Sequence, residues 1–164
     1  MNQNKQVESG RTMVEMLGVL AIMGVISMAM ITAYNVAFMR FRMNNLMYEI
    51  SLRTISYVHQ MELAPLAPGS ILYSGEFGSV TNGGYPVKAR VTNNPNHFEV
   101  IVEGVPTDIC EQVLRLYTHP LSMRVKNGGV EKGYDRADEN ISICGTKKTT
   151  DEMIFVFSKM FERN

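Results

Sequence analysis

One acidic side chain, Glu15, lies near the start of a long apolar run, where its chemistry is that of an ion-pairing group in a medium of low polarity. The run continues without another charged residue until Arg40. About 20 apolar residues suffice for a helix to cross a bilayer, and this run is long enough. Two roles fit the acid: a group that reaches headgroups or water at the interface, or a recognition charge that requires a cationic partner.

The two cysteines of the chain, Cys110 and Cys144, have a different chemistry. In an exported domain such a pair forms one disulfide, whereas in a cytosolic domain it remains as two free thiols. The apolar segment favours export and therefore the bridge. The chain-entropy account gives such a bridge a stabilisation of about 4 kcal/mol.

Acidic residues near the C-terminal end offer oxygen ligands for calcium; they are Asp135, Asp138, Glu139 and Asp151. Their spacing matches no defined calcium loop, and the basic residues Lys132 and Arg136 are interleaved with them, so a solvated charged loop is favoured. The sequence has no nucleophile motif, phosphate loop or metal cluster. We therefore expect no enzyme, no cofactor and no metal.

A single long helix is predicted to carry Glu15, over residues 11 to about 62. Residues 11–39 are apolar on all sides, as expected for lipid or a bundle core. Within this part, Ser27 and Thr32 are positioned to bond either across helices or back onto their own backbone. Residues 40–62 are amphipathic, and Pro65 ends the helix. The apolar face comprises Met43, Leu46, Met47, Ile50, Tyr57, Val58 and Met61, and the residues between are Arg42, Asn45, Glu49, Arg53 and Gln60.

Residues 63–164 predict a small head with an antiparallel sheet. Residues 85–92 and 97–105 alternate as a hairpin with one buried face, joined by a turn at 93–96. A short strand is expected near 71–73, a third strand over 121–126, a loop over 127–140 and a central strand over 153–158. A short helix over 106–117 is expected to turn Ile109, Val113 and Leu116 inward. The fold class is α+β.

The chain has 16 basic and 16 acidic residues. A formal charge of zero gives no electrostatic reason to expect a nucleic acid as partner. The basic residues before and after the apolar run do not settle its orientation in a membrane.

The order of polar leader, Gly10, Glu15 and apolar run resembles the N-terminus of type IV pilins and pilin-like proteins. In that family a prepilin peptidase cuts after a glycine, and a glutamate lies five residues beyond the cut. The resemblance implies cleavage between Gly10 and Arg11, loss of residues 1–10 and methylation of the new amine. Arg11 departs from the Phe or Met that is usual at this position.

The same resemblance implies the pilin fold, a spine helix on an antiparallel sheet, and a structural role in a filament. The expected partners are other copies of the chain or related pilins, the prepilin peptidase, the inner-membrane assembly machinery and, before assembly, the membrane itself. Glu15 would neutralise the α-amine of a neighbouring Arg11. The protein would start in a bacterial inner membrane as a single-pass precursor and then enter an extracellular pilus or a periplasm-spanning filament.

In pilins a disulfide delimits a C-terminal region, and the setting of Cys110 and Cys144 looks most like that of type IVb pilins. Two alternatives remain. A type II secretion pseudopilin shares the N-terminus and builds a short periplasmic filament. A single-pass anchored periplasmic domain that never polymerises would keep residues 1–10 and would tolerate the loss of Glu15.

Overall fold

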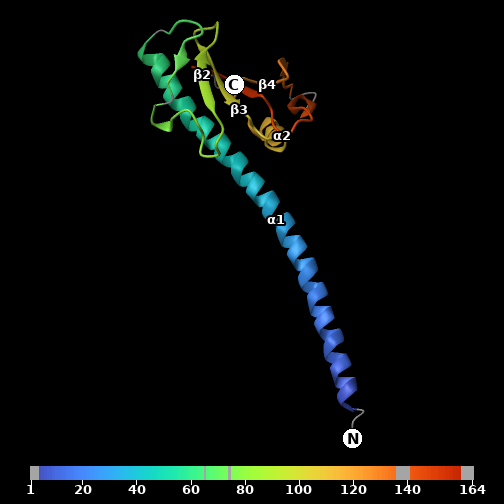
Figure 1. Cartoon of the computed structure of the whole chain (residues 1–164). Helices are drawn as coiled ribbons and strands as arrows, with labels where there is room; N and C mark the ends of the chain where they lie inside the picture. Colours follow the sequence, from blue (N-terminus) through green and yellow to red (C-terminus); the bar gives the residue numbers. More distant parts are fainter. Residues whose placement is uncertain (1–3, 65, 74, 136–140, 160–164) are drawn as a thin grey trace. The chain divides into compact units, whose positions relative to one another are not determined.

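The structure is a computed structural model that describes residues 4–64, 66–73, 75–135 and 141–159. It comprises two units, Met1–Arg40 and Phe41–Asn164. Helix α1 (Asn4–Leu63) begins earlier than the expected Arg11 and ends close to the expected position (Figure 1). Its sequence contains no proline and is rich in Met, which favours helix, and it ends shortly before Pro65.

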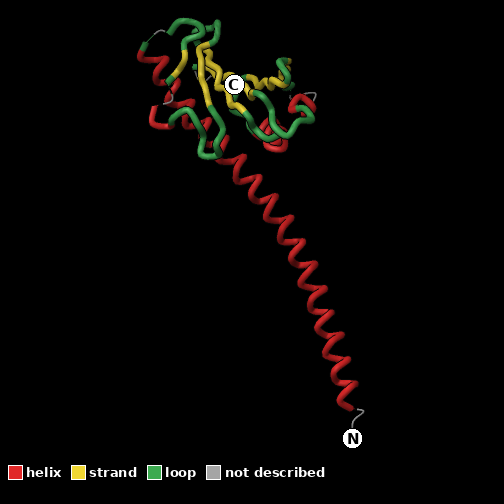
Figure 2. The backbone as a smooth tube through the Cα atoms, in the orientation of Figure 1, coloured by secondary structure: helices red, strands yellow, loops and turns green. Residues whose placement is uncertain are grey.

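The second unit contains one antiparallel sheet of six strands beside the C-terminal part of α1 (Figure 2). The order across the sheet is β1-β2-β3-β6-β4-β5. The strands are β1 (Ile71–Leu72), β2 (Val87–Val91), β3 (His97–Glu103), β4 (Ser122–Asn127), β5 (Val130–Gly133) and β6 (Glu152–Ser158). An α+β fold is therefore confirmed, and so is the prediction that the last strand is central.

The core lies between α1 and one face of the sheet. Five of the seven residues predicted for the apolar helix face are buried: Met43, Leu46, Ile50, Tyr57 and Met61. The Tyr57 ring meets Phe98 of β3 edge-on, with centroids 6.0 Å apart, and Phe98 stacks on Phe157 of β6. Aromatic contacts of this kind join the helix to the two central strands.

Helix α2 (Thr107–Leu116) covers the remainder of the same core. Ile109 and Val113 are buried as predicted, but the inward placement of Leu116 is wrong because its side chain is 59 % exposed. Tyr117 occupies that position instead, with its ring against Phe155 and its hydroxyl sharing a 3.0 Å hydrogen bond with Ser51 of α1. Burial raises the pKa of the Tyr117 phenol, and the Ser51 bond opposes part of this shift.

The loop expected over residues 127–140 is partly wrong, because β5 lies within it. Gly128 and Gly129 both have positive φ, 59° and 80°, and form a two-residue turn between β4 and β5. Such turns need positive φ at both central positions, which glycine adopts without strain. All four β5 residues are exposed, so no burial pattern marks the strand in the sequence. Residues 136–140 lie outside the described part.

The expectation of one buried face in the hairpin holds for β2 but not for β3. On β3, Ile101 and Glu99 are buried on the opposite side from Phe98. On this outer side the Glu99 carboxylate pairs with Arg90 of β2 and Arg124 of β4. β3 therefore lacks the alternation of buried and exposed residues that β2 retains.

The largest difference from the sequence prediction concerns Glu49 and Arg53, which were expected between the apolar positions of α1. Both are buried, with 8 % and 2 % exposure. The Arg53 guanidinium donates to the carbonyl oxygens of Phe77, Gly78 and Val80 at 2.7–2.9 Å. Glu49 accepts the Asn82 N–H through both carboxylate oxygens. The two charges therefore fix the segment 77–82 against α1.

Replacing Arg53 tests this account of the 77–82 segment. Arg53→Met should lower the free energy of unfolding by about 3 kcal/mol, because it leaves Glu49 and three carbonyl groups buried without their cation. The measurement is chemical denaturation of the full chain in detergent. Arg115→Met, the same change at an exposed arginine of α2, serves as control. Equal stability of both variants would contradict the structural role of Arg53.

Candidate functional site

The surface that differs most from that of an ordinary soluble protein is the apolar part of α1 in the first unit. Every large apolar side chain from Met13 to Phe38 is exposed, at 47–76 %. This stretch is long and apolar enough to cross a membrane, and none of it is buried within the protein. Water is an unfavourable environment for such a surface, and lipid or other apolar helices are favourable ones.

The residues predicted for processing and assembly all lie on α1. Gly10 and Arg11 belong to its first turns, and Glu15 follows four residues after Arg11. The structure thus places the predicted cut and the acid on one helix.

The polar hydroxyls of the apolar run bond to their own helix. Ser27 Oγ donates to the carbonyl oxygen of Met23 at 2.8 Å, and Thr32 Oγ1 donates to that of Met28 at 2.8 Å. Of the two alternatives left open by the sequence, the structure contains the local one. The hydroxyl groups therefore add little polarity to the helix surface.

The disulfide expected from the sequence is present between Cys110 of α2 and Cys144 of the short helix η2 (Ile141–Cys144). Both cysteines are fully buried. The bridge joins α2 to a segment that follows β5, across a Cα separation of 6.1 Å. It closes a loop that contains β4 and β5 and thereby restricts the unfolded chain.

Asn127, at the end of β4, reinforces the bridged region. Its side-chain amide donates to the carbonyl oxygens of Ile143 and Cys144 at 2.9 and 3.0 Å. Its side-chain oxygen accepts the Asp151 N–H, and the Asp151 carboxylate accepts the Gly128 N–H. One asparagine thus links the β4–β5 turn, η2 and the start of β6.

These contacts give Asp151 a structural role. Among the described residues, no three His, Cys, Asp or Glu side chains are grouped so that they could hold a metal ion. Asp138 and Glu139, which the sequence also offered for calcium, lie outside the described residues. The described chain therefore gives no support to a calcium site around Asp151.

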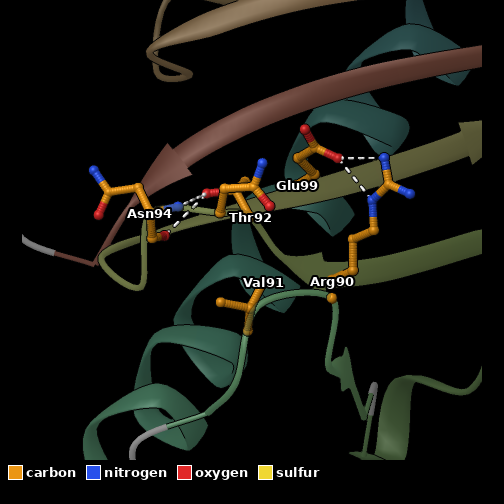
Figure 3. A pocket seen from close by; sticks show the side chains of 7 residues that line it. Arg90, Val91, Thr92, Asn94 and Glu99 are labelled. Carbon is orange, nitrogen blue, oxygen red and sulfur yellow. Dashed lines mark hydrogen bonds and ion pairs between the residues drawn. The ribbon is translucent and has the colours of Figure 1, made fainter.

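A shallow hollow beside the β2–β3 turn contains a second charged group (Figure 3). Glu99 accepts from Arg90 at 2.8 Å and pairs with Arg124 of β4 on its other side. Thr92 and Asn94 bond to each other in the turn. Because Arg90 and Arg124 flank the Glu99 carboxylate, these three side chains form a cross-strand ion-pair cluster.

Comparison of the chain with protein-family models, curated proteins and solved structures found no match.

Sequence reasoning missed a face of α1 within the second unit. Phe41, Tyr48 and Ile55 are 60–65 % exposed, on the side where charged residues were expected. Their spacing of seven residues was the available signal, because such positions fall on one side of a helix. The neighbouring apolar positions that line the core obscured this second, exposed set.

Removing the disulfide should destabilise the head measurably. We expect the variant Cys110→Ala/Cys144→Ala to lose about 2–4 kcal/mol of unfolding free energy, because the open loop regains entropy in the unfolded chain. Thermal unfolding of the full chain, with and without reductant, provides the measurement. Reductant should lower the melting temperature of the parent chain and leave the variant unchanged; a reductant-insensitive parent would refute the bridge.

Proposed function

We propose that this chain is a structural subunit of a type IV pilus-like filament. It would be inserted in a membrane as a single-pass precursor, cleaved after Gly10 and polymerised through α1. The new α-amine of Arg11 would be a substrate for methylation. The head, residues 63–164, would face away from the filament core.

The observation that carries this proposal is a helix with exposed apolar residues on every side and one acid near its start. A helix that is apolar all round needs lipid or a bundle of helices around it. A plain membrane anchor has no need of Glu15, since a carboxylate within an apolar segment is costly. In a filament core, the new amine of each cleaved neighbouring subunit would be a cation available to Glu15.

The energetics of transfer from membrane to filament are consistent with this role. The helix would exchange lipid contacts for protein contacts of similar polarity, so close packing and charge pairing would decide the docking. Pairing of Glu15 with an amine gains Coulomb energy and loses solvation, and the two largely cancel. Its main effect would be on register, since a subunit docked one step wrong leaves a buried charge unpaired.

The head supports the proposal in a more general way. A six-stranded antiparallel sheet packed on the second half of a long helix agrees with the architecture that the resemblance implies. The Cys110–Cys144 bridge suits a domain that folds in an oxidising compartment. These features fit an exported filament subunit, and they fit a pseudopilin equally well.

Cleavage after Gly10 is the first test. Gly10→Glu should leave the precursor uncut in the membrane, because the side chain enters the proposed peptidase site where the family has glycine. Mass spectrometry of the N-terminus provides the readout, with Ser9→Ala as a control that keeps the glycine. If the parent protein isolated from its producing cells retains Met1, the filament proposal fails.

The acid is tested separately, after cleavage has been verified. Glu15→Val should be inserted and cut normally but should enter filaments at least about tenfold less, because the neighbouring amine is then buried without a counter-charge. Glu15→Asp keeps the negative charge and should be incorporated into filaments more efficiently than Glu15→Val. Sheared filaments are quantified by immunoblot against the membrane pool. Normal incorporation of Glu15→Val would favour an anchor in which the acid has no role in assembly.

A further inference from the structure

A hollow of about 350 Å³ lies where the segment 77–82 meets α1. Asn45, Tyr48, Glu49 and Arg53 line it from the helix, and Phe77 and Asn82 line it from the segment. Small-molecule sites in proteins have volumes of about 300–1,000 Å³, so the hollow has the size of a small site. None of these residues takes part in the proposed cleavage or in the pairing of Glu15.

The Glu49 carboxylate in this hollow has fewer partners than its burial requires. Its side chain is 10 % exposed. Within the described residues it accepts one N–H group, that of Asn82, which its two oxygens share at 2.9 and 3.1 Å. A carboxylate can accept about four hydrogen bonds. A buried charge is costly unless it is paired and hydrogen-bonded, so Glu49 retains acceptor capacity that the folded chain leaves unused.

Arg53 compensates the charge of Glu49 only in part. Its Nη2 atom lies 3.8 Å from the Glu49 Oε2 atom, which is too far for a hydrogen bond. The same guanidinium donates to three backbone carbonyl oxygens of the segment 77–82. Arg53 follows Glu49 by one helix turn, whereas Asn45 precedes it by one turn and is neutral. The hollow therefore holds a carboxylate with a cation on one side and an uncharged amide on the other.

We propose that this hollow binds a primary ammonium group on an alkyl stem. The three N–H donors of an ammonium match the carboxylate of Glu49 and the side-chain oxygens of Asn45 and Asn82. Hydrogen bonds between such charged groups are about twice as strong as neutral ones. The Tyr48 and Phe77 rings line the same hollow, where they suit the apolar stem and attract a cation to their faces. A free alkylamine and the lysine side chain of another protein both carry this chemistry.

A metal ion and an anion fit the hollow less well. Calcium takes about six to eight oxygen ligands, whereas Glu49 is the one carboxylate on the described wall. An anion requires a cation with free donors, and both terminal nitrogens of Arg53 already donate to backbone carbonyls. The charge that lacks hydrogen-bond partners is the negative one, and the amide and aromatic lining suits an organic cation.

Titration of the full chain in non-ionic detergent tests the site. Calorimetry should show saturable binding of cadaverine, and at least about tenfold weaker binding of 1,5-pentanediol, which has a similar length and no charge. Nα-acetyl-lysine methylamide is titrated in the same way. Tighter binding of cadaverine supports the site and assigns it to free amines, and tighter binding of the lysine derivative supports it and assigns it to a protein side chain. Absence of saturable binding of both amines, or equal binding of the diol, would overturn the proposal.

Matched variants test the residues. Glu49→Gln keeps an oxygen for the Asn82 N–H and should lower the affinity for cadaverine at least about tenfold, whereas Glu103→Gln, elsewhere on the sheet, should not. Tyr48→Leu removes an aromatic wall and should weaken binding several-fold, with Tyr73→Leu, at a ring that is 76 % exposed, as its control. Unchanged affinity in Glu49→Gln would refute the site; if that variant does not fold, unchanged affinity in Tyr48→Leu would refute it. These measurements need no filament, so their failure leaves the proposed function standing.

Discussion

The packing of the second half of α1 on the inner face of the sheet is the constraint on which the rest of the head depends. Tyr57 against Phe98, and Phe98 against Phe157, connect the helix to the two central strands. Successive residues of a helix are related by a fixed rotation about its axis. Once one face of α1 packs on the sheet, the direction of every other side chain on the helix is therefore set. Glu49 and Arg53 then fall at the edge of the contact, where the 77–82 segment covers them.

Burial of these two charges is acceptable only because their hydrogen bonds are nearly all made to backbone groups of one loop. An Arg53 without the three carbonyl oxygens, or a Glu49 without the Asn82 N–H, would cost several kcal/mol. The loop in turn gains partners for backbone groups that no strand satisfies. The pair thus positions Phe77 and Asn82 beside the exposed Tyr48 ring of the helix.

The periodic spacing of apolar residues predicted those elements that have one buried side and one exposed side. The core face of α1, the hairpin of β2 and β3, and the central position of β6 all follow from the placement of apolar residues. Two cysteines in a chain with an apolar N-terminal segment also sufficed to predict their bridge. Gly10, Arg11 and Glu15 remain predictions from a motif, because a single chain holds no neighbouring subunit against which to place them.

Other features depend on tertiary neighbours and have no periodic signal. β5 is paired through its backbone and exposed on both faces, so only the Gly128–Gly129 turn marks it. Leu116 is apolar and has the spacing of an inward-facing residue of α2. Tyr117 is buried in its place, because its ring packs against Phe155 and its hydroxyl hydrogen-bonds to Ser51. The inward direction of Arg53 follows from a loop more than twenty residues later, which local patterns along the helix do not contain.

The order of strands has a consequence for how the head is made. β6 joins β3 to β4, although it follows every other described strand in the chain. Until it arrives, β1, β2 and β3 form one partial sheet and β4 with β5 another, each with an open edge. Cys110 and Cys144 both precede β6, so oxidation of the thiols can tether the second partial sheet before the first is joined to it. Synthesis of the chain must therefore have passed β6 before the two halves become one cooperative body.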